Sequence, residues 1–205
     1  MDQITSNLMK YINQGGPAIM WPLVGMFVLA VAIFLWRIVI ILIALFNTRL
    51  LFQKVNAALQ DREHGIRNAM DICAKTPGPT ATILHAGLSR AHHGIEHVEK
   101  AVAGAGAVEM SFLENGLVWL ATIANIAPLL GFYGTVAGMI IAFNAIAKAG
   151  DVEPTIVANG ISIALITTAG GLLVAMPTQI FYNLCVWLID RVVVTMDEST
   201  NKLID

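Results

Sequence analysis

Two apolar stretches rich in glycine and threonine, residues 117–147 and 155–189, lie close together in the second half of the chain, and neither contains a charged side chain. Each is long enough to cross a bilayer as a helix, which takes roughly 20 residues at about 1.5 Å per residue. Helices in lipid have no hydrophobic reason to associate. They pack where small residues let backbones touch and where hydroxyl groups bond across. The pattern therefore predicts part of a tightly packed helical membrane assembly.

A third apolar stretch, residues 17–46, precedes these two. Charged residues make up 13% of the chain, against about 25% in an average soluble domain. The net charge of −2 gives no reason to expect nucleic-acid binding. We predict an all-α membrane protein with three transmembrane helices and long cytoplasmic helical extensions. Its predicted segments are an amphipathic segment at 1–16, transmembrane helices at 17–46, 117–147 and 155–189, and connecting or terminal segments at 47–116, 148–154 and 190–205.

The distribution of lysine and arginine predicts the orientation in the membrane. Residues 47–116 carry seven of them and the segment from Asp190 onward carries two more, whereas the opposite side has only Lys10 and Lys148. Because cytoplasmic segments are enriched in these residues, we expect 47–116 and 190–205 in the cytoplasm. Residues 1–16 and 148–154 are then expected in the periplasm of a bacterial inner membrane, and Asp2 to Gln14 would lie in the outer interface as a short amphipathic helix.

The predicted cytoplasmic region, 47–116, has the pattern of helical hairpins with a turn at 76–79. With few large side chains, it is expected to bury hardly any core of its own and to pack as extensions of the spans. His93 and His97 are four residues apart, a spacing that can bind a metal from one helix face. No third ligand accompanies them, so an ordinary exposed helix face is favoured and no metal or cofactor is expected.

Three residues mark special positions along the predicted spans. Arg37 follows a long uncharged run in the first span, and its guanidinium is expected to reach lipid headgroups near the inner interface. A role for Arg37 in ion passage is the less favoured alternative. Pro128 and Pro177 fall on the inner side of their spans, where proline kinks or caps a helix.

The second and third spans carry no carboxylate, so this chain cannot relay protons through carboxylates of its own. No nucleophile–base pair, metal cluster or phosphate loop is visible, and an enzyme is not expected. The spans can supply hydroxyl groups and a shaped wall. Small residues recur at helical spacing on one face of each span, with one threonine near the middle of each stripe. The stripes are Ala124, Gly131, Thr135, Gly138 and Ala142 in the second span, and Gly160, Ala164, Thr168, Gly171 and Ala175 in the third.

Two interpretations of these stripes remain open on spacing alone. Plain helix packing is favoured, because small stripes pack helices in many membrane proteins. A pore wall wrapping other helices is the alternative, with the hydroxyls of Thr135 and Thr168 facing the pore. Thr167 is expected to point elsewhere and to bond the backbone or a neighbouring helix.

Several motifs together resemble the MotA/TolQ/ExbB proton-channel family, and most closely a short ExbB-like or TolQ-like subunit. The resemblance spans the membrane portion, whereas residues 47–116 match only in length and helical character. The residues that carry it are Gly15-Gly16-Pro17, Met20-Trp21-Pro22-Leu23, Arg37, Ile126-Ala127-Pro128-Leu129-Leu130-Gly131, Gly134-Thr135-Val136, Gly138-Met139-Ile140, Ala142-Phe143, Gly160-Ile161-Ser162, Ala164-Leu165, Thr167-Thr168-Ala169, Gly171-Leu172, Pro177 and Tyr182-Asn183.

The resemblance implies a homopentamer in the inner membrane, with a central pore lined by the second and third spans. The pore would enclose the transmembrane helices of two ExbD-like or TolR-like partners, whose aspartate carries the proton. Proton flow would then energise an envelope process through a TonB-like or TolA-like transducer, with membrane lipids around the assembly. The implied pore-lining residues are Thr135, Thr168, Gly131, Gly138, Ala164 and Gly171.

Three positions depart from the family pattern. Ile163 stands where members commonly have glutamate in Gly-Ile-x-Glu-Ala-Leu, and Trp36 stands before Arg37 where Glu-Arg is common. Tyr133 adds a hydroxyl just before Thr135. Ile163 and Tyr133 are therefore candidate pore modulators, and Thr167, which matches the family motif, is a third candidate. The competing hypothesis is a non-conducting membrane scaffold, whose small stripes only pack helices.

Overall fold

The computed structural model describes residues 9, 11–59, 64–149 and 154–204. Every regular element within those ranges is a helix, which confirms the all-α prediction for them. Three stretches are long and apolar enough to cross a membrane, namely Pro17–Leu45, Ile95–Lys148 and Val157–Met196. The elements are α2 (Pro17–Leu59), α3 (Gly65–Lys75), α4 (Pro79–Leu88), the 3-10 turn η1 (Ala91–His93), α5 (Ile95–Glu114), α6 (Leu117–Ala149) and α7 (Pro154–Ile204).

Glycine and proline set the start of the first long helix. Gly16 has φ +81°, a backbone conformation that glycine adopts without steric cost, and α2 begins at the next residue, Pro17. Residues 11–14 form a helical turn before it, closed by a 2.8 Å hydrogen bond from the Gly15 N–H to the Tyr11 carbonyl. The rest of the predicted amphipathic segment, residues 1–8 and 10, lies outside the described residues.

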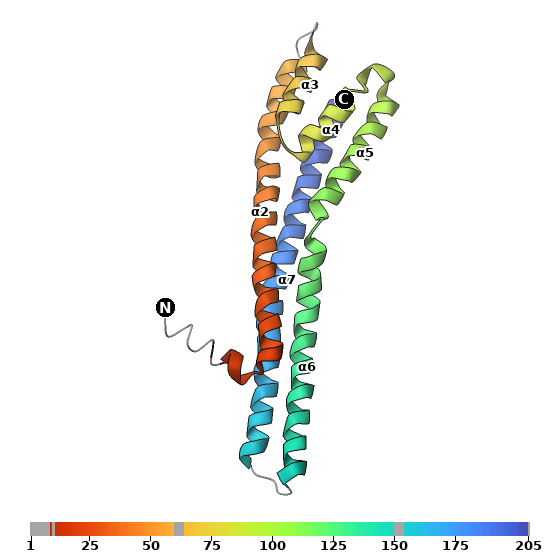
Figure 1. The fold of residues 1–205 in the computed structure, drawn as a ribbon. Coiled ribbons are helices and arrows are strands. Elements are labelled where there is room, and N and C mark those ends of the chain that lie inside the picture. Colours follow the sequence, from red (N-terminus) through yellow and green to blue (C-terminus); the bar gives the residue numbers. More distant parts are fainter. Residues whose placement is uncertain (1–8, 10, 60–63, 150–153, 205) are drawn as a thin grey trace. The chain divides into compact units, whose positions relative to one another are not determined.

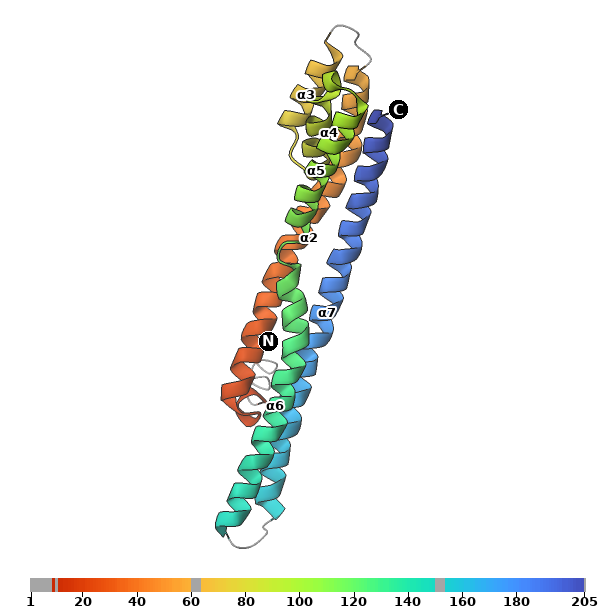
Figure 2. The same ribbon diagram turned by 90° about the vertical axis from the view of Figure 1, so that its right-hand side faces the viewer.

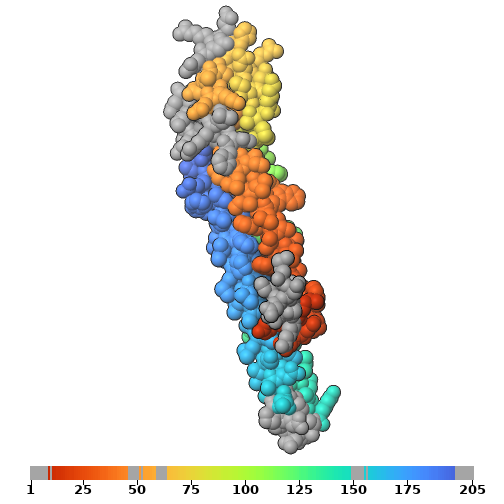
Figure 3. Space-filling view, turned by 90° about the vertical axis from the view of Figure 1, so that its left-hand side faces the viewer, coloured from red at the N-terminus to blue at the C-terminus, as the bar shows by residue number. Residues whose placement is uncertain are grey.

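The chain divides into two compact units: unit 1 comprises 1–34 with 118–183, and unit 2 comprises 35–117 with 184–205. In unit 1, α7 and the first half of α2 run in one direction and α6 runs in the other (Figure 1 and Figure 2). The rings of Phe34 and Phe181 stack with centroids 4.2 Å apart. Figure 3 shows the start of α2, in red and orange-red, lying beside α7, in light blue. The first helix thus covers one side of α7.

Unit 2 buries a hydrophobic cluster, and this corrects the expectation that the region between the first two spans has hardly any core. The end of α2 packs on the short helices α3 and α4, which are joined through Gly78 at φ +141°. Burial of the Cys73 thiol raises its pKa to about 11. The expectation failed because alanine, cysteine and leucine pack closely when helices are short and cross near their small residues. The cluster consists of Leu51, Val55, Ala69, Cys73, Ala81, Leu84 and Leu88.

Arg37 lies inside unit 2, which differs from the expectation that its guanidinium reaches headgroups. The side chain is 8% exposed, and Nη2 donates a 3.1 Å hydrogen bond to the Phe112 carbonyl in the last turn of α5. Gly116, at φ +88°, brings the chain past the same guanidinium into α6. The last carbonyls of a helix lack partners within the helix and favour a nearby cation. Arg37 therefore holds the corner between α5 and α6.

Candidate functional site

The two predicted stripes of small residues face each other within one chain, as the seam between α6 and α7. A Cβ atom built on Gly138 would lie 2.9 Å from the Gly160 carbonyl oxygen, and one built on Gly171 would lie 2.6 Å from the Ala127 carbonyl oxygen. Real Cβ atoms essentially never approach other atoms closer than about 3 Å. The helices are therefore as close as their backbones allow, and no passage runs through the seam of one chain. The buried positions are Gly131, Gly134, Gly138 and Ala142 on α6, and Gly160, Ala164 and Gly171 on α7.

Thr167 is the side chain packed most deeply beside the seam. It has no exposed surface and lies directly against Gly134, where any side chain would collide with it. Its hydroxyl donates to the carbonyls of Ile163, at 3.1 Å, and Ala164, at 2.9 Å. A threonine hydroxyl in an apolar setting commonly bonds back to its own helix in this way.

Thr135 and Thr168 border the seam without being buried in it. The hydroxyl of Thr168 lies 3.3 Å from the Gly131 carbonyl on α6 and 3.2 Å from the Ala164 carbonyl on its own helix. The hydroxyl of Thr135 donates to the Phe132 carbonyl at 2.6 Å. Each hydroxyl donates its single proton to a backbone carbonyl. The lone pairs on its oxygen therefore remain able to accept a hydrogen bond from a group outside the chain.

Thr167 and Thr168 lie on opposite sides of the seam, because consecutive helical residues are about 100° apart. Thr167 is on the side of α2, since a Cβ atom built on Gly170, three residues later, would lie 3.2 Å from the Met20 side chain of α2. Gly134 of α6 touches Thr167, so Thr135 turns to the side where Thr168 lies. That side is exposed and apolar, and we call it the open edge. It comprises Thr135, Thr168, Phe132, Leu165 and Leu172.

The two remaining candidate modulators lie away from the open edge. Tyr133 is 61% exposed, on a part of α6 that faces neither α7 nor the open edge. Its hydroxyl has no hydrogen bond within the part of the chain that the structure describes. Ile163 is half-buried near Gly16 and lines a cavity of about 270 Å³ together with Thr155 and Asn159 of α7.

The two span prolines lie inside continuous helices. α6 runs through Pro128 and α7 through Pro177 without interruption. A proline has no N–H and therefore leaves the carbonyl four residues earlier without its helical bond. Near Pro177, the buried hydroxyl of Thr178 donates to the Val174 carbonyl at 2.7 Å. Spacing did not single out Thr178, although it follows Gly171 by seven residues and so shares its face.

His93 and His97 do not share one helix. His93 ends η1, Gly94 intervenes at φ +96°, and His97 lies in the first turn of α5. Their ring centroids are 6.1 Å apart and both side chains are exposed. The described residues bring no third histidine, cysteine or carboxylate to this pair.

The sequence pattern of the MotA/TolQ/ExbB proton channel family matches residues 75–198. The chain belongs to this family. The match covers α6, most of α7 and therefore the whole seam, together with α4 and α5. The matched region thus includes both threonines, Thr135 and Thr168.

Individual relatives carry names from the same family. The chain is 44% identical over 75 residues to the Tol-Pal system protein TolQ of Haemophilus influenzae, covering 37% of this chain and 33% of that protein. It is 35% identical over 126 residues to an ExbB homologue of Methanothermobacter thermautotrophicus, covering 62% and 44%. For biopolymer transport protein exbB1 of Vibrio cholerae the identity is 38% over 88 residues, covering 42% and 39%. The chain thus spans less than half the length of these curated relatives.

Proposed function

We propose that this chain is the channel, or stator, subunit of a complex driven by the proton-motive force, like ExbB with ExbD or TolQ with TolR. The observation that carries the proposal is the placement of Thr135 and Thr168. Both hydroxyls border one exposed edge of a wall that has no charged side chain between 117 and 147 or between 155 and 189. Such a wall can accept hydrogen bonds but cannot itself carry a proton.

The pore in this proposal is formed between copies of the chain, because the seam within one chain is closed. Five copies would place α6 and α7 alternately around a centre, each open edge facing inward. Thr135 and Thr168 would line the pore there. Gly131, Gly138, Ala164 and Gly171 would form the back of the wall, where close backbones keep it thin and rigid.

Tyr133 supports the association of several copies. It lies at the midpoint of α6 and points away from α7, so in a single chain its phenol would face hydrocarbon. A hydroxyl without a partner in an apolar medium costs about 1–3 kcal/mol, and tyrosine normally lies at the membrane surface. A neighbouring copy, packed on this face of α6, can offer the acceptor that lipid tails lack.

The proton carrier in this proposal is an aspartate on the transmembrane helix of a single-span partner of the ExbD or TolR kind, held inside the pore. The excess of lysine and arginine in 47–116 and after Asp190 favours a cytoplasmic location for unit 2. The N-terminus would then be periplasmic in a bacterial inner membrane. A TonB-like or TolA-like transducer would receive the work, and the chain itself would not be an enzyme.

A non-conducting scaffold remains the second candidate, and one feature favours it. Ile163 occupies the position where members of the family commonly have a glutamate, and an isoleucine cannot exchange protons. A scaffold would use the seam for packing alone, with no dependence on the proton-motive force.

The deciding experiment is to co-express the chain with single-span proteins that carry a transmembrane aspartate, and to weigh the detergent-extracted complex. Five copies with two partner copies, together with proton uptake into liposomes that the partner's aspartate-to-asparagine change abolishes, is the expected result. A complex that forms without such a partner and passes no protons would reject the channel and leave the scaffold.

A further inference from the structure

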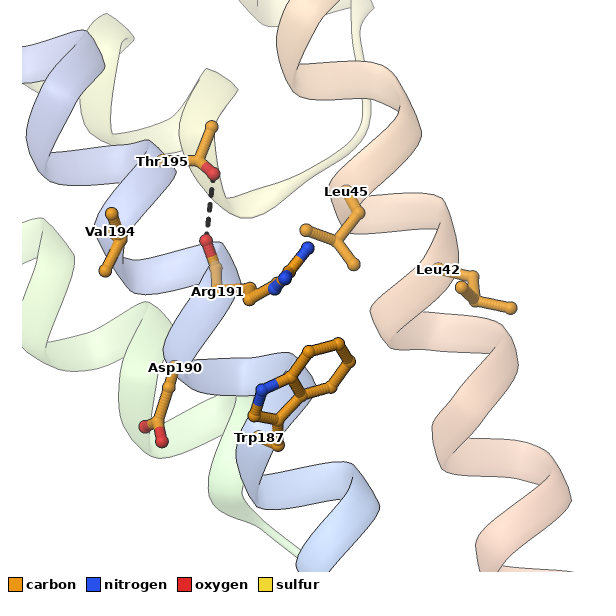
Figure 4. Close-up of a pocket in the computed structure, with 7 residues that line it drawn as sticks. All are labelled: Leu42, Leu45, Trp187, Asp190, Arg191, Val194 and Thr195. Carbon is orange, nitrogen blue, oxygen red and sulfur yellow. Dashed lines mark hydrogen bonds between the residues drawn. The ribbon is translucent and has the colours of Figure 1, made fainter.

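A groove in unit 2 lies apart from the seam and its threonines. It has a volume of about 640 Å³ and lies between α2 and α7. Figure 4 shows Leu45 on α2 facing Arg191, with Trp187 one turn away from the arginine on α7. Leu42, about one turn from Leu45 on α2, also contributes to the lining. Val194, Asp190 and Thr195 complete the lining. Most of this lining is apolar, and its two charged side chains are adjacent in the sequence.

The groove lies where α7 leaves the apolar part of its span. Residues 155–189 carry no charge, and Asp190 and Arg191 are the first charged residues after them. Trp187 is one turn earlier, and tryptophan concentrates at the boundary between hydrocarbon and water. The groove therefore has an apolar part at the depth of acyl chains and a charged part at the depth of headgroups.

The charges in the groove have no ionic partner within the residues that the structure describes. The Arg191 guanidinium lies 4.4 Å from the centre of the Trp187 ring, a cation–π contact that holds it in place. The dashed line in Figure 4 is the hydrogen bond from the Thr195 hydroxyl to the Arg191 backbone carbonyl, at 2.8 Å. This bond involves the backbone of Arg191 and not its guanidinium. Asp190 forms no ion pair with it. A cation and an anion thus line one apolar groove.

We propose that this groove binds a phospholipid with a phosphoethanolamine headgroup. The phosphate would accept hydrogen bonds from Arg191, and the ammonium group would donate to Asp190. One acyl chain would lie along Leu42 and Trp187, on the membrane side of Arg191. An anionic headgroup such as phosphoglycerol would satisfy Arg191 and be repelled by Asp190. Phosphocholine has no N–H to donate to the carboxylate.

Two substitutions test the charge complementarity, and both residues are exposed, so the fold tolerates the change. The purified protein would be titrated with phosphatidylethanolamine, phosphatidylcholine and phosphatidylglycerol, and bound lipid counted by native mass spectrometry. We expect Arg191→Gln to weaken phosphatidylethanolamine binding about tenfold or more, as loss of one charge-assisted hydrogen bond does. Asp190→Asn should reverse the preference toward phosphatidylglycerol. Arg67→Gln, at an exposed position of α3, is the matched control and should change nothing.

Two results would overturn the proposal. Equal binding of all three lipids, unchanged by either substitution, would mean that the groove has no headgroup specificity. Cysteines placed at Leu42 and Val194 that cross-link between copies and exclude lipid would mean that a second copy of the chain fills the groove. Neither result bears on the proposed channel function. That function is tested separately, by proton uptake into liposomes.

Discussion

The hydroxyl of Thr168 lies 3.3 Å from the carbonyl oxygen of Gly131, across the seam between α7 and α6. The absence of a side chain at Gly131 permits this approach, since a Cβ atom there would lie 3.1 Å from the Cα of Thr168. The bond fixes the Thr168 side chain at the open edge, and the hydroxyl proton is donated to a carbonyl of the same chain. The oxygen is left to accept a hydrogen bond from a group outside the chain, such as a protonated carboxyl.

The first prediction concerns the two threonines of the open edge. Thr135→Val together with Thr168→Val removes both hydroxyls at nearly constant volume. We expect partner-dependent proton uptake into liposomes to fall about tenfold or more, the effect of roughly 1.4 kcal/mol on a barrier. Thr122→Val is the matched control, because Thr122 also bonds its own helix, to Val118 at 2.7 Å, but lies on another face of α6. Undiminished uptake in the double variant would remove the threonines from the proton path.

The second prediction concerns the closeness of the seam. Gly171→Ala adds a methyl group 2.6 Å from the Ala127 carbonyl oxygen, so the helices must separate, at a cost of about 1–3 kcal/mol. We expect a lower thermal unfolding temperature in detergent and less assembled complex. Gly25→Ala in α2 is the control, because the added carbon would meet no atom within 4 Å other than those of its chain neighbours and its own helix backbone. Equal stability of the two variants would contradict the packing described here.

The third prediction concerns Tyr133. Tyr133→Phe removes only the hydroxyl, which bonds nothing within the described part of its own chain. If a neighbouring copy accepts it, the variant should dissociate more readily on dilution while the single chain keeps its helicity. Analytical ultracentrifugation measures the first and circular dichroism the second. Tyr11→Phe, an exposed tyrosine before the start of α2, should leave assembly unchanged. If Tyr133→Phe and the wild-type protein dissociated at the same protein concentration, Tyr133 would lie outside the contact between copies.

The fourth prediction concerns the corner held by Arg37. Arg37→Gln withdraws the charge from the Phe112 carbonyl, and we expect a loss of about 1–3 kcal/mol in the stability of unit 2. Gly116→Ala should act at the same place, since its φ of +88° disfavours a side chain and the added carbon would lie 3.1 Å from the Arg37 Nε. Limited proteolysis near residue 115 reports on the corner. Arg90→Gln, at an exposed position, serves as the control and should be cut no faster than the wild type.

The fifth prediction concerns pH. The Cys73 thiol has a pKa of about 11 in the folded chain, above its ordinary value of 9.0, because burial disfavours the thiolate. The folded state therefore retains a proton that the unfolded chain loses, and this contribution is present below pH 9 and lost as pH rises through 11. We expect stability to fall in that window by at most about 3 kcal/mol. Thermal unfolding of Cys73→Ala at the same pH values should lack this component. If the stabilities of the wild type and Cys73→Ala fell in parallel as pH rises, the loss of stability would not come from the Cys73 thiol.

Much of the fold follows from local patterns in the sequence. Uncharged runs of sufficient length predicted three membrane-crossing helices, and Gly16-Pro17 marked the start of the first. The regular recurrence of Gly131, Gly138, Ala164 and Gly171 predicted two small faces. Length, charge and helical period act along one chain segment at a time, so they can be read without tertiary contacts.

The environment of single polar residues could not be predicted in this way. Arg37 was expected at the headgroups because its neighbours in the sequence are apolar, yet it bonds a carbonyl 75 positions away. The cluster around Cys73 was missed because its members come from three helices with weak individual patterns. Contacts of this kind depend on which elements meet, and no window of sequence contains that information.

The sequence by itself determined that this chain forms long apolar helices with two small faces, since hydrophobicity and helical period are properties of each segment. Only the tertiary structure decided that these faces close on each other, that Thr167 is buried while Thr168 remains at an open edge, and that the Arg191 guanidinium packs on the Trp187 ring. The reason is geometric. A helix presents every side of itself, and only the position of its neighbours decides which side is covered.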